Sequence, residues 1–409
     1  MLLYDNKRIK LLNFLKLGIN PFRKFVSTGE IKEELGLVKS RDELFQFIKE
    51  RLEKENNIII PIIGDVGVGK THLYWMLRYN LYFHNSIYLS LESLKNRFYY
   101  TIYSEFIEIL GVDLLRFILN QLCTQWGALE RKYGFFHVAN LERAKSRALE
   151  HFLSLYDEKD IDIIEDIING IIIHQFDPYN KIEAEEWLLG RLMDAKELSR
   201  LNMNVDLRKS KSAYMMLRIL IENSKLDTVL FIDDFEKIIT IMKPKDESAE
   251  EVFDPSWLYG NEKSPDDIKS EKILNRLTKL ITINKLRIII TLKSLDLLNE
   301  IKQKFEEFYP DFILNIGEPL FIENFKENDI FEFYTQNINR FYEEMDFKEF
   351  IGAFQNEYFP LNKKTLKKIY YQTQGNPREV IKALIEIFNQ IIYSDERLDE
   401  ILENYEKSN

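Results

Sequence analysis

The sequence predicts an α/β fold in which helices flank a parallel β-sheet. The apolar run Ile58–Ile63 has the composition of a strand that is buried on both faces, as strands of parallel sheets are. Two more β-rich runs, Thr228–Ile232 and Leu286–Thr291, alternate with segments of helical periodicity. With only 15 Gly and 10 Pro among 409 residues, we expect these helices to be long and rarely interrupted.

The composition limits the class of protein. The length of 409 residues corresponds to two or three domains of about 100–200 residues each. The net charge of −11 means that contact with a nucleic acid would need a local basic patch, for which residues 208–211 are the best candidate. The single cysteine, Cys123, excludes an internal disulfide and favours a reducing compartment, so we expect a cytoplasmic location. We expect neither a signal peptide nor a membrane span, because the apolar stretches are too short.

Shifts in periodicity divide the chain into four expected regions. They are an N-terminal lead-in (1–56), a sheet-containing core (57–92 and 227–320), a helical insertion (93–226) and a helical C-terminal region (321–409). The lead-in is expected to contain a helix from Arg41 to Lys54. In the insertion we find almost no strand signal. The helices expected there are Val112–Trp126, Leu141–Tyr156 and Ile182–Leu198.

Local signals refine the core. Pro61 cannot donate to a strand ladder, so we expect a strand start or a local irregularity at this residue. A helix over Lys70–Tyr82 and a strand over Ser86–Leu91 should follow. Phe312–Ile316 is expected to form another strand. The segment Met242–Lys269 is rich in charged residues, Pro and Ser, and we expect an exposed loop there.

A candidate anion-binding loop follows the first strand. Residues Gly64–Thr71 fit the pattern G-x-x-x-x-G-K-[ST], in which glycines let the backbone direct successive N–H groups at phosphate oxygens. The helix that begins near Lys70 directs its positive end at the same charge. Lys70 should reach the β- and γ-phosphates, and the Thr71 hydroxyl should hold Mg²⁺. The residues expected to bind the nucleotide are Gly64, Asp65, Val66, Gly67, Val68, Gly69, Lys70 and Thr71.

An acidic segment supplies a partner for this loop. In Val229–Glu236, four apolar residues bury a strand, and Asp233 emerges at its carboxyl end, where it can hold the water shell of Mg²⁺. Either Asp234 or Glu236 can act as the base that polarises an attacking water. The alternative is a plain strand end, followed by a helix that an aspartate caps.

These two segments resemble the Walker A and Walker B motifs of the additional-strand P-loop ATPases. That group contains the AAA+ proteins and the related STAND signalling ATPases. The resemblance implies a three-layer αβα P-loop core with a parallel sheet, a C-terminal helical lid, and hydrolysis of ATP with Mg²⁺. No guanine-reading N-K-x-D motif occurs, so the choice of ATP over GTP follows from the resemblance.

Three shorter segments extend the resemblance in the order of the family. Leu286–Ser294 resembles the sensor 1 strand, with Thr291 as the matching polar residue. Gln374–Arg378, which reads Gln-Gly-Asn-Pro-Arg, resembles the sensor 2 turn of origin-recognition initiators and archaeal STAND ATPases. It implies that Arg378 reaches the γ-phosphate from the lid. Leu37–Leu44 resembles the segment that lies near adenine. The alternatives are a buried strand threonine bonded to the backbone and a surface arginine.

Three departures from the family pattern affect the expected function. Asp234 stands where the family has Glu, so hydrolysis should be slow, or Glu236 takes that role. Between Thr291 and Leu320 the chain has lysines but no arginine that could act as a finger, which disfavours a closed ring. Too few residues follow Arg378 in this sequence to form the winged-helix DNA-binding domain of the initiators.

Two functions stay open at this point. The first is a nucleotide-dependent conformational switch in signalling, defence or scaffold assembly, in which residues 93–226 recognise a protein partner. The second is an initiator-like or transposition-helper-like ATPase that acts on DNA. The acidic charge and the missing finger favour the first function, whereas the sensor 2 turn favours the second. The oligomeric state is left open.

Overall fold

The computed structural model describes residues 2–23, 38–81, 84–94, 97–132, 136–155, 160–242 and 265–407. The chain forms two compact units. The first consists of Met1–Lys54, Ile62–Asn80 and Leu320–Asn409, and the second consists of Glu55–Pro61 and Leu81–Pro319. The domain division expected from the sequence stays a prediction.

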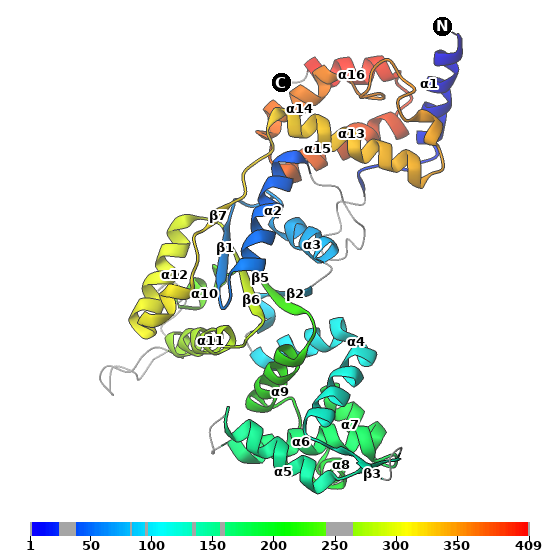
Figure 1. Cartoon of the computed structure of the whole chain (residues 1–409). Coiled ribbons are helices and arrows are strands. Elements are labelled where there is room, and N and C mark those ends of the chain that lie inside the picture. Colours follow the sequence, from blue (N-terminus) through cyan, green and yellow to red (C-terminus); the bar gives the residue numbers. More distant parts are fainter. Residues whose placement is uncertain are drawn as a thin grey trace. The chain divides into compact units, whose positions relative to one another are not determined.

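A five-stranded parallel sheet carries both candidate motifs (Figure 1). Its strands are β1 (Ile59–Ile63), β2 (His84–Ser90), β5 (Asp227–Asp233), β6 (Leu286–Leu292) and β7 (Leu320–Phe321). Their order is β2-β5-β6-β1-β7. Every residue of β1 and β6 is buried, as expected of strands that are covered on both faces. The predicted α/β class with a parallel sheet is therefore confirmed.

Strand β1 does not start at Pro61, but the expected local irregularity is present in its ladder. Ile59 pairs with Ile316 whereas Ile62 pairs with Leu320, so the neighbouring segment has one extra residue opposite Pro61. The carbonyl of Ile59 accepts a hydrogen bond from the backbone N–H of Gly317 at 2.9 Å. Because alternate residues of a strand direct their polar groups to the same side, the nitrogen of Pro61 also faces this neighbour. Residues 317–319 form no strand there, so the donor that proline lacks falls at a gap in the ladder.

The rest of the second unit is mostly helical. Its helices are α4 (Phe98–Gln125), α5 (Leu141–Leu153), α6 (Ile161–Phe176), α7 (Lys181–Leu188), α8 (Ala195–Arg200), α9 (Ser210–Asn223), α10 (Lys237–Met242), α11 (Pro265–Ile281) and α12 (Leu295–Phe308). An antiparallel pair of strands, β3 (Leu129–Lys132) and β4 (Phe136–Ala139), lies between these helices, whereas almost no strand was expected in this region.

Two expected elements of this unit are wrong. The helix expected over Ile182–Leu198 is split into α7 and α8, because Gly190 has a left-handed backbone (φ 75°) and Asp194 caps the second helix. The strand expected over Phe312–Ile316 is mainly a 3-10 helix, η5 (Pro310–Asn315), and only Ile316 makes a single bridge. In both places residues that end or start a helix outweigh the apolar pattern: Gly190 and Asp194 in the first, and Pro310 in the second.

Part of the expected loop Met242–Lys269 can be compared with the structure. Residues 243–264 lie outside the described residues. Residues 265–269 form the first part of α11, with Pro265 at its first position, where proline needs no donor. The C-terminal end of the expected loop is therefore helical.

The first unit combines the two ends of the chain. Its helices are α1 (Leu2–Leu15), α2 (Lys39–Lys54), α3 (Lys70–Asn80), α13 (Glu327–Glu344), α14 (Lys363–Thr373), α15 (Pro377–Tyr393) and α16 (Leu398–Lys407). Phe22 is fully buried in its core, with ring centroids 5.8 Å from Tyr334 and 5.3 Å from Phe388. The N-terminal residues thus complete the core of the C-terminal helices. None of the described helices has the length and the apolar character that a bilayer crossing requires.

Phe22→Ala should destabilise the first unit by about 3–5 kcal/mol, because it leaves a cavity among buried aromatic rings. Thermal and urea unfolding would measure the loss. Phe47→Ala is the matched control, since that side chain is exposed and its removal should change the stability by less than about 0.5 kcal/mol. Equal stability of the two variants would contradict the packing of the N-terminal segment.

Candidate functional site

The candidate residues form two clusters, one in each compact unit. The loop cluster belongs to the first unit and comprises residues 64–71, the lid turn 374–378 and Arg41. The acidic cluster belongs to the second unit. Its members are Tyr88, Glu92, Asp233, Asp234, Glu236, Lys237, Thr291 and Lys293.

The loop 64–71 has a tight backbone that depends on its glycines. The loop connects β1 to α3, which begins at Lys70 as predicted. Its backbone is left-handed at Gly67 (φ 87°) and Gly69 (φ 102°), a conformation that favours glycine. A Cβ on Gly64 would lie 2.2 Å from the side chain of Ile322, so this glycine allows the close approach of the chain after β7.

The ammonium group of Lys70 lies within the loop. Its Nζ donates to the carbonyl of Gly64 at 2.6 Å and to that of Asp65 at 3.0 Å, and the residue is only 9% exposed. A lysine at the start of α3 thus folds back over the N-terminal half of the loop. The predicted contact of Lys70 with the β- and γ-phosphates stays a prediction.

The lid turn contacts the loop directly. The side-chain amide of Asn376 donates to the carbonyl of Val66 at 2.9 Å, and the backbone N–H of Arg378 donates to the carbonyl of Gly67 at 3.2 Å. A Cβ on Gly67 would lie 2.6 Å from Oδ1 of Asn376. The turn predicted as sensor 2 therefore lies against the loop predicted as Walker A. The side chain of Arg378 itself is exposed.

Arg41 reaches the same loop from α2. Its Nη2 donates to the carbonyl of Val68 at 3.3 Å and to the carbonyl of Glu323. The guanidinium also lies 5.6 Å from the ring centroid of Phe325. Burial lowers the pKa of Arg41, and the carboxylates of Asp329 and Glu323 oppose that shift. The segment expected near adenine thus supplies a contact to the loop, while its first residue, Leu37, lies outside the described residues.

His72 follows Thr71 in the first turn of α3. Burial and the charge of Arg41 lower the pKa of His72 to about 4. The imidazole is therefore neutral near pH 7, and it does not add a positive charge to the loop. This agrees with a role in packing.

Asp233 is the most extensively bonded member of the acidic cluster. It ends β5 and is buried. Its Oδ1 accepts hydrogen bonds from the N–H of Asp234 at 3.0 Å and from the hydroxyl of Thr291. Its Oδ2 accepts a hydrogen bond from the hydroxyl of Tyr88 at 2.7 Å. The sequence reasoning missed Tyr88, because only the register of β2 with β5 brings this residue beside the aspartate.

Thr291 ties the carboxyl ends of β5 and β6 together. Besides donating to Asp233, its hydroxyl accepts a hydrogen bond from the N–H of Asp234 at 3.1 Å. Its carbonyl accepts one from the N–H of Phe235 at 2.9 Å. The candidate sensor 1 residue therefore holds the acidic turn in place, and its predicted contact with a nucleotide stays a prediction.

The two candidate bases differ in their surroundings. Asp234 has a left-handed backbone (φ 52°), and its carboxylate pairs with Nζ of Lys237 at 2.9 Å. A hydrogen bond to Asp234 is the main cause that raises the pKa of Lys237. Both carboxylate oxygens of Glu236 are buried without a hydrogen bond, and Nζ of Lys293 lies 3.3 Å from one of them. Glu236 thus has the larger unused capacity to accept hydrogen bonds.

Magnesium is the metal ion that the sequence predicts for this site. Among the described residues, no group of three or more His, Cys, Asp or Glu side chains could hold a metal ion. Mg²⁺ in nucleotide sites keeps several waters and phosphate oxygens, and it needs only one or two protein oxygens. A threonine hydroxyl and an aspartate carboxylate, such as Thr71 and Asp233, are oxygens of that kind.

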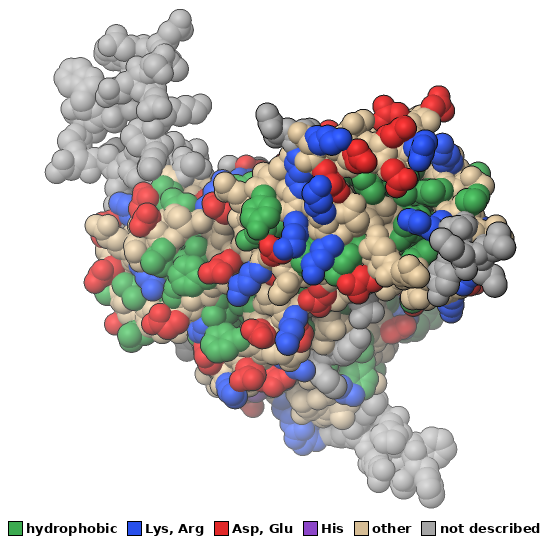
Figure 2. All heavy atoms as spheres, turned by 90° about the horizontal axis from the view of Figure 1, so that it is seen from above, with side chains coloured by type: hydrophobic (Ala, Val, Ile, Leu, Met, Phe, Trp, Pro, Cys, Tyr) green, Lys and Arg blue, Asp and Glu red, His purple; other side chains and the backbone are tan. Residues whose placement is uncertain are grey.

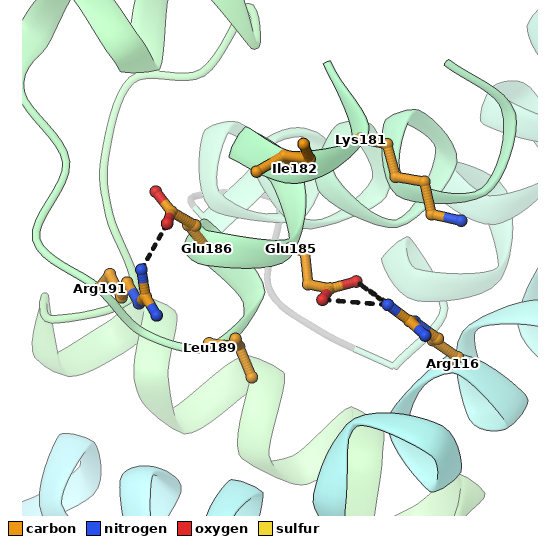
Figure 3. A pocket seen from close by; sticks show the side chains of 7 residues that line it. All are labelled: Arg116, Lys181, Ile182, Glu185, Glu186, Leu189 and Arg191. Carbon is orange, nitrogen blue, oxygen red and sulfur yellow. Dashed lines mark hydrogen bonds and ion pairs between the residues drawn. The ribbon is translucent and has the colours of Figure 1, made fainter. Parts of the chain in front are cut away.

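A pocket of about 350 Å³ lies among the helices of the second unit (Figure 3). Its walls are Arg116, Lys181, Ile182, Glu185, Glu186, Leu189 and Arg191. Arg116 pairs with Glu185 at 2.8 Å, and Arg191 pairs with Glu186. Because most of these charges are paired with one another, they do not indicate a ligand of a particular charge.

The candidate basic patch is partly neutralised as well. Lys211 pairs with Asp160 at 2.8 Å, and the guanidinium of Arg208 lies 5.7 Å from the ring centroid of Tyr100. The face drawn in Figure 2 shows Lys and Arg side chains interspersed with Asp and Glu.

Comparison with known proteins adds no relative: no family model matches the chain, and no curated protein matches it. The proposed class of protein therefore rests on the motifs and on the geometry of the two clusters.

Proposed function

We propose that this chain is a P-loop ATPase of the AAA+/STAND type that acts as a nucleotide-dependent conformational switch. The observation that carries the proposal is the loop Gly64–Thr71. It follows a buried strand, its backbone is left-handed at two glycines, and it leads into a helix at Lys70. This is the arrangement that directs backbone N–H groups and a helix N-terminus at a phosphate group.

The strand order supports the additional-strand core. Strand β6, which carries Thr291, lies between β1 and β5. β1 precedes the loop, and Asp233 ends β5. Because the carboxyl ends of parallel strands meet at one edge of a sheet, this order suits a Walker A and Walker B pair with a sensor strand between them.

Each residue has a proposed role in binding Mg·ATP. The amides of the loop and Lys70 bind the phosphates, and Thr71 and Asp233 hold the metal ion through its coordination or water shell. Arg378 reaches the γ-phosphate from the lid, and Thr291 positions the acidic turn. The proposed reaction is the hydrolysis of ATP to ADP and phosphate.

Glu236 is the preferred base. Its buried carboxylate makes no hydrogen bond, whereas the carboxylate of Asp234 is held by Lys237. Lys293, which follows β6, has its Nζ 3.3 Å from the carboxylate of Glu236. It supplies a positive charge beside Glu236 in the segment Thr291–Leu320, which contains no arginine. We expect slow turnover, because Glu236 lies beyond the usual position of the family's glutamate.

A protein is the preferred partner. Three large apolar side chains between α6 and α8 are strongly exposed, namely Tyr179, Ile182 and Leu192. Tyrosine is enriched in protein interfaces, and contact with a partner would remove these three apolar side chains from water. The proposal that the segment 93–226 recognises a protein rests on them.

Lys70→Ala should weaken the binding of Mg·ATP about 100-fold or more, because the ammonium makes charge-assisted hydrogen bonds to phosphate oxygens. Isothermal titration with a slowly hydrolysed ATP analogue would measure the affinity. Lys54→Ala is the control, since this exposed lysine pairs only with Glu50 in its own helix. An unchanged affinity of Lys70→Ala would remove the proposed function.

Glu236→Gln should lower the rate of phosphate release at saturating ATP about 100-fold, while Asp234→Asn should lower it less than about fivefold. Both variants should bind Mg·ATP like the wild type, since neither residue is proposed to hold the phosphates. A reversed order would assign the base to Asp234, and normal turnover in both variants would refute the acidic cluster as the hydrolytic site.

Action on DNA is the second candidate, and the resemblance of the lid turn to the initiators is the observation that favours it. With a net charge of −11, we expect no DNA binding at about 150 mM salt, with or without ATP. A salt titration with a fluorescent DNA duplex tests this. ATP-dependent binding that weakens steeply with salt would replace the protein-partner proposal with the DNA proposal.

A further inference from the structure

Three successive carbonyl groups of the loop are bound from outside the loop. Val66, Gly67 and Val68 accept hydrogen bonds from the Asn376 side chain, the Arg378 backbone and the Arg41 side chain, respectively. The donors come from the lid turn and from α2, and all of them belong to the first unit. We call these three hydrogen bonds the carbonyl clamp.

Peptide geometry links the clamp to the opposite side of the loop. In a trans peptide the C=O and the following N–H point in opposite directions. The clamped carbonyls share their peptide planes with the N–H groups of Gly67, Val68 and Gly69. Fixing each carbonyl therefore fixes the N–H of the same peptide in the direction away from its donor, and these N–H groups are among those that the glycine pattern offers to a phosphate.

We propose that the carbonyl clamp positions the phosphate-binding amides, and that Asn376 is the positioning residue through which the lid controls nucleotide affinity. This inference rests on the proposed function. A loop whose amides are already oriented loses less conformational freedom on binding, and it therefore binds more tightly. The reverse also holds: a nucleotide that orders these amides favours the docked lid turn, because coupling between two sites is reciprocal.

Asn376 performs two tasks with its two amide atoms. Its Oδ1 caps α15 by accepting hydrogen bonds from the N–H groups of Arg378 and Glu379 at 3.1 and 3.4 Å. Its Nδ2 donates to the carbonyl of Val66. The residue that starts the lid helix thus also holds the loop. The two tasks can be separated, because serine and aspartate cap helices well but neither offers an amide donor.

The clamp has a signature that distinguishes it from a γ-phosphate sensor. The oriented amides would contact phosphates that ATP and ADP share, so loss of the clamp weakens both nucleotides alike. Loss of Arg378 as a sensor would weaken ATP and spare ADP. The ratio of the two affinities therefore reports which role a lid residue plays.

The test compares Asn376→Ser with Asn362→Ser. Asn362 caps α14 in the same way, through the N–H of Thr365, but its amide donates to Glu406 and not to the loop. Asn376→Ser should weaken Mg·ADP and the Mg complex of a slowly hydrolysed ATP analogue by about fivefold each, as expected for one lost hydrogen bond. Asn362→Ser should leave both affinities unchanged.

Hydrogen–deuterium exchange of the nucleotide-free protein gives a second measurement. Asn376→Ser should speed exchange in a peptide that covers residues 64–71, and Asn362→Ser should not. Unchanged exchange and affinity in Asn376→Ser, or a loss confined to the ATP analogue, would overturn the clamp. If the wild-type protein binds neither nucleotide and Asn376→Ser still exchanges faster than the wild type, the clamp is supported and the proposed ATPase is refuted.

Discussion

The left-handed backbone at Gly67 is the constraint on which the loop cluster depends. A side chain at this residue would be strained, and its Cβ would come within 2.6 Å of the Asn376 amide oxygen. The same glycine therefore permits the bend of the loop and the approach of the lid turn. At Gly375 the lid meets a similar limit, because a Cβ there would lie 2.0 Å from the carbonyl oxygen of Phe325. Gly67 thus permits the approach of Asn376 to the loop, and Gly375 permits the approach of the turn to the segment that follows β7.

The carboxylates of the acidic cluster differ in their bonding: those of Asp233 and Asp234 are held by hydrogen bonds or an ion pair, whereas that of Glu236 makes no hydrogen bond. Asp233 accepts three hydrogen bonds from the protein, and such bonds hold a carboxylate in one orientation. Glu236 is equally buried but has only a cation at 3.3 Å, which attracts it without saturating its oxygens. Burying a carboxylate that makes no hydrogen bond lowers the stability of the folded state, so such a group is unusual where its only role is to stabilise the fold. The contrast is the main structural reason to assign the two residues different tasks.

Local patterns predicted the parts of this structure that local forces determine. The strands at Ile59–Ile63 and Leu286–Leu292 follow from apolar runs, and the start of α3 at Lys70 follows from the glycine pattern before it. The hydrogen bonds from Tyr88 to Asp233 and from Asn376 to Val66 join residues that are 145 and 310 positions apart. Only strand register and helix packing determine such pairs, so no short motif could reveal them. The split of the helix at Gly190 was missed because the apolar periodicity continues across it.

The burial of Phe22 determines how far the chain can be shortened at its N-terminal side without exposing the core. The recognisable motifs begin near Leu37, yet Leu11, Leu15 and Phe22 belong to the same apolar core as Ile387 and Phe388 of α15. A shortened chain that begins at the first motif would leave the aromatic surface of α13 and α15 exposed to water. Such a surface promotes aggregation, so residues 2–23 belong structurally with the C-terminal helices.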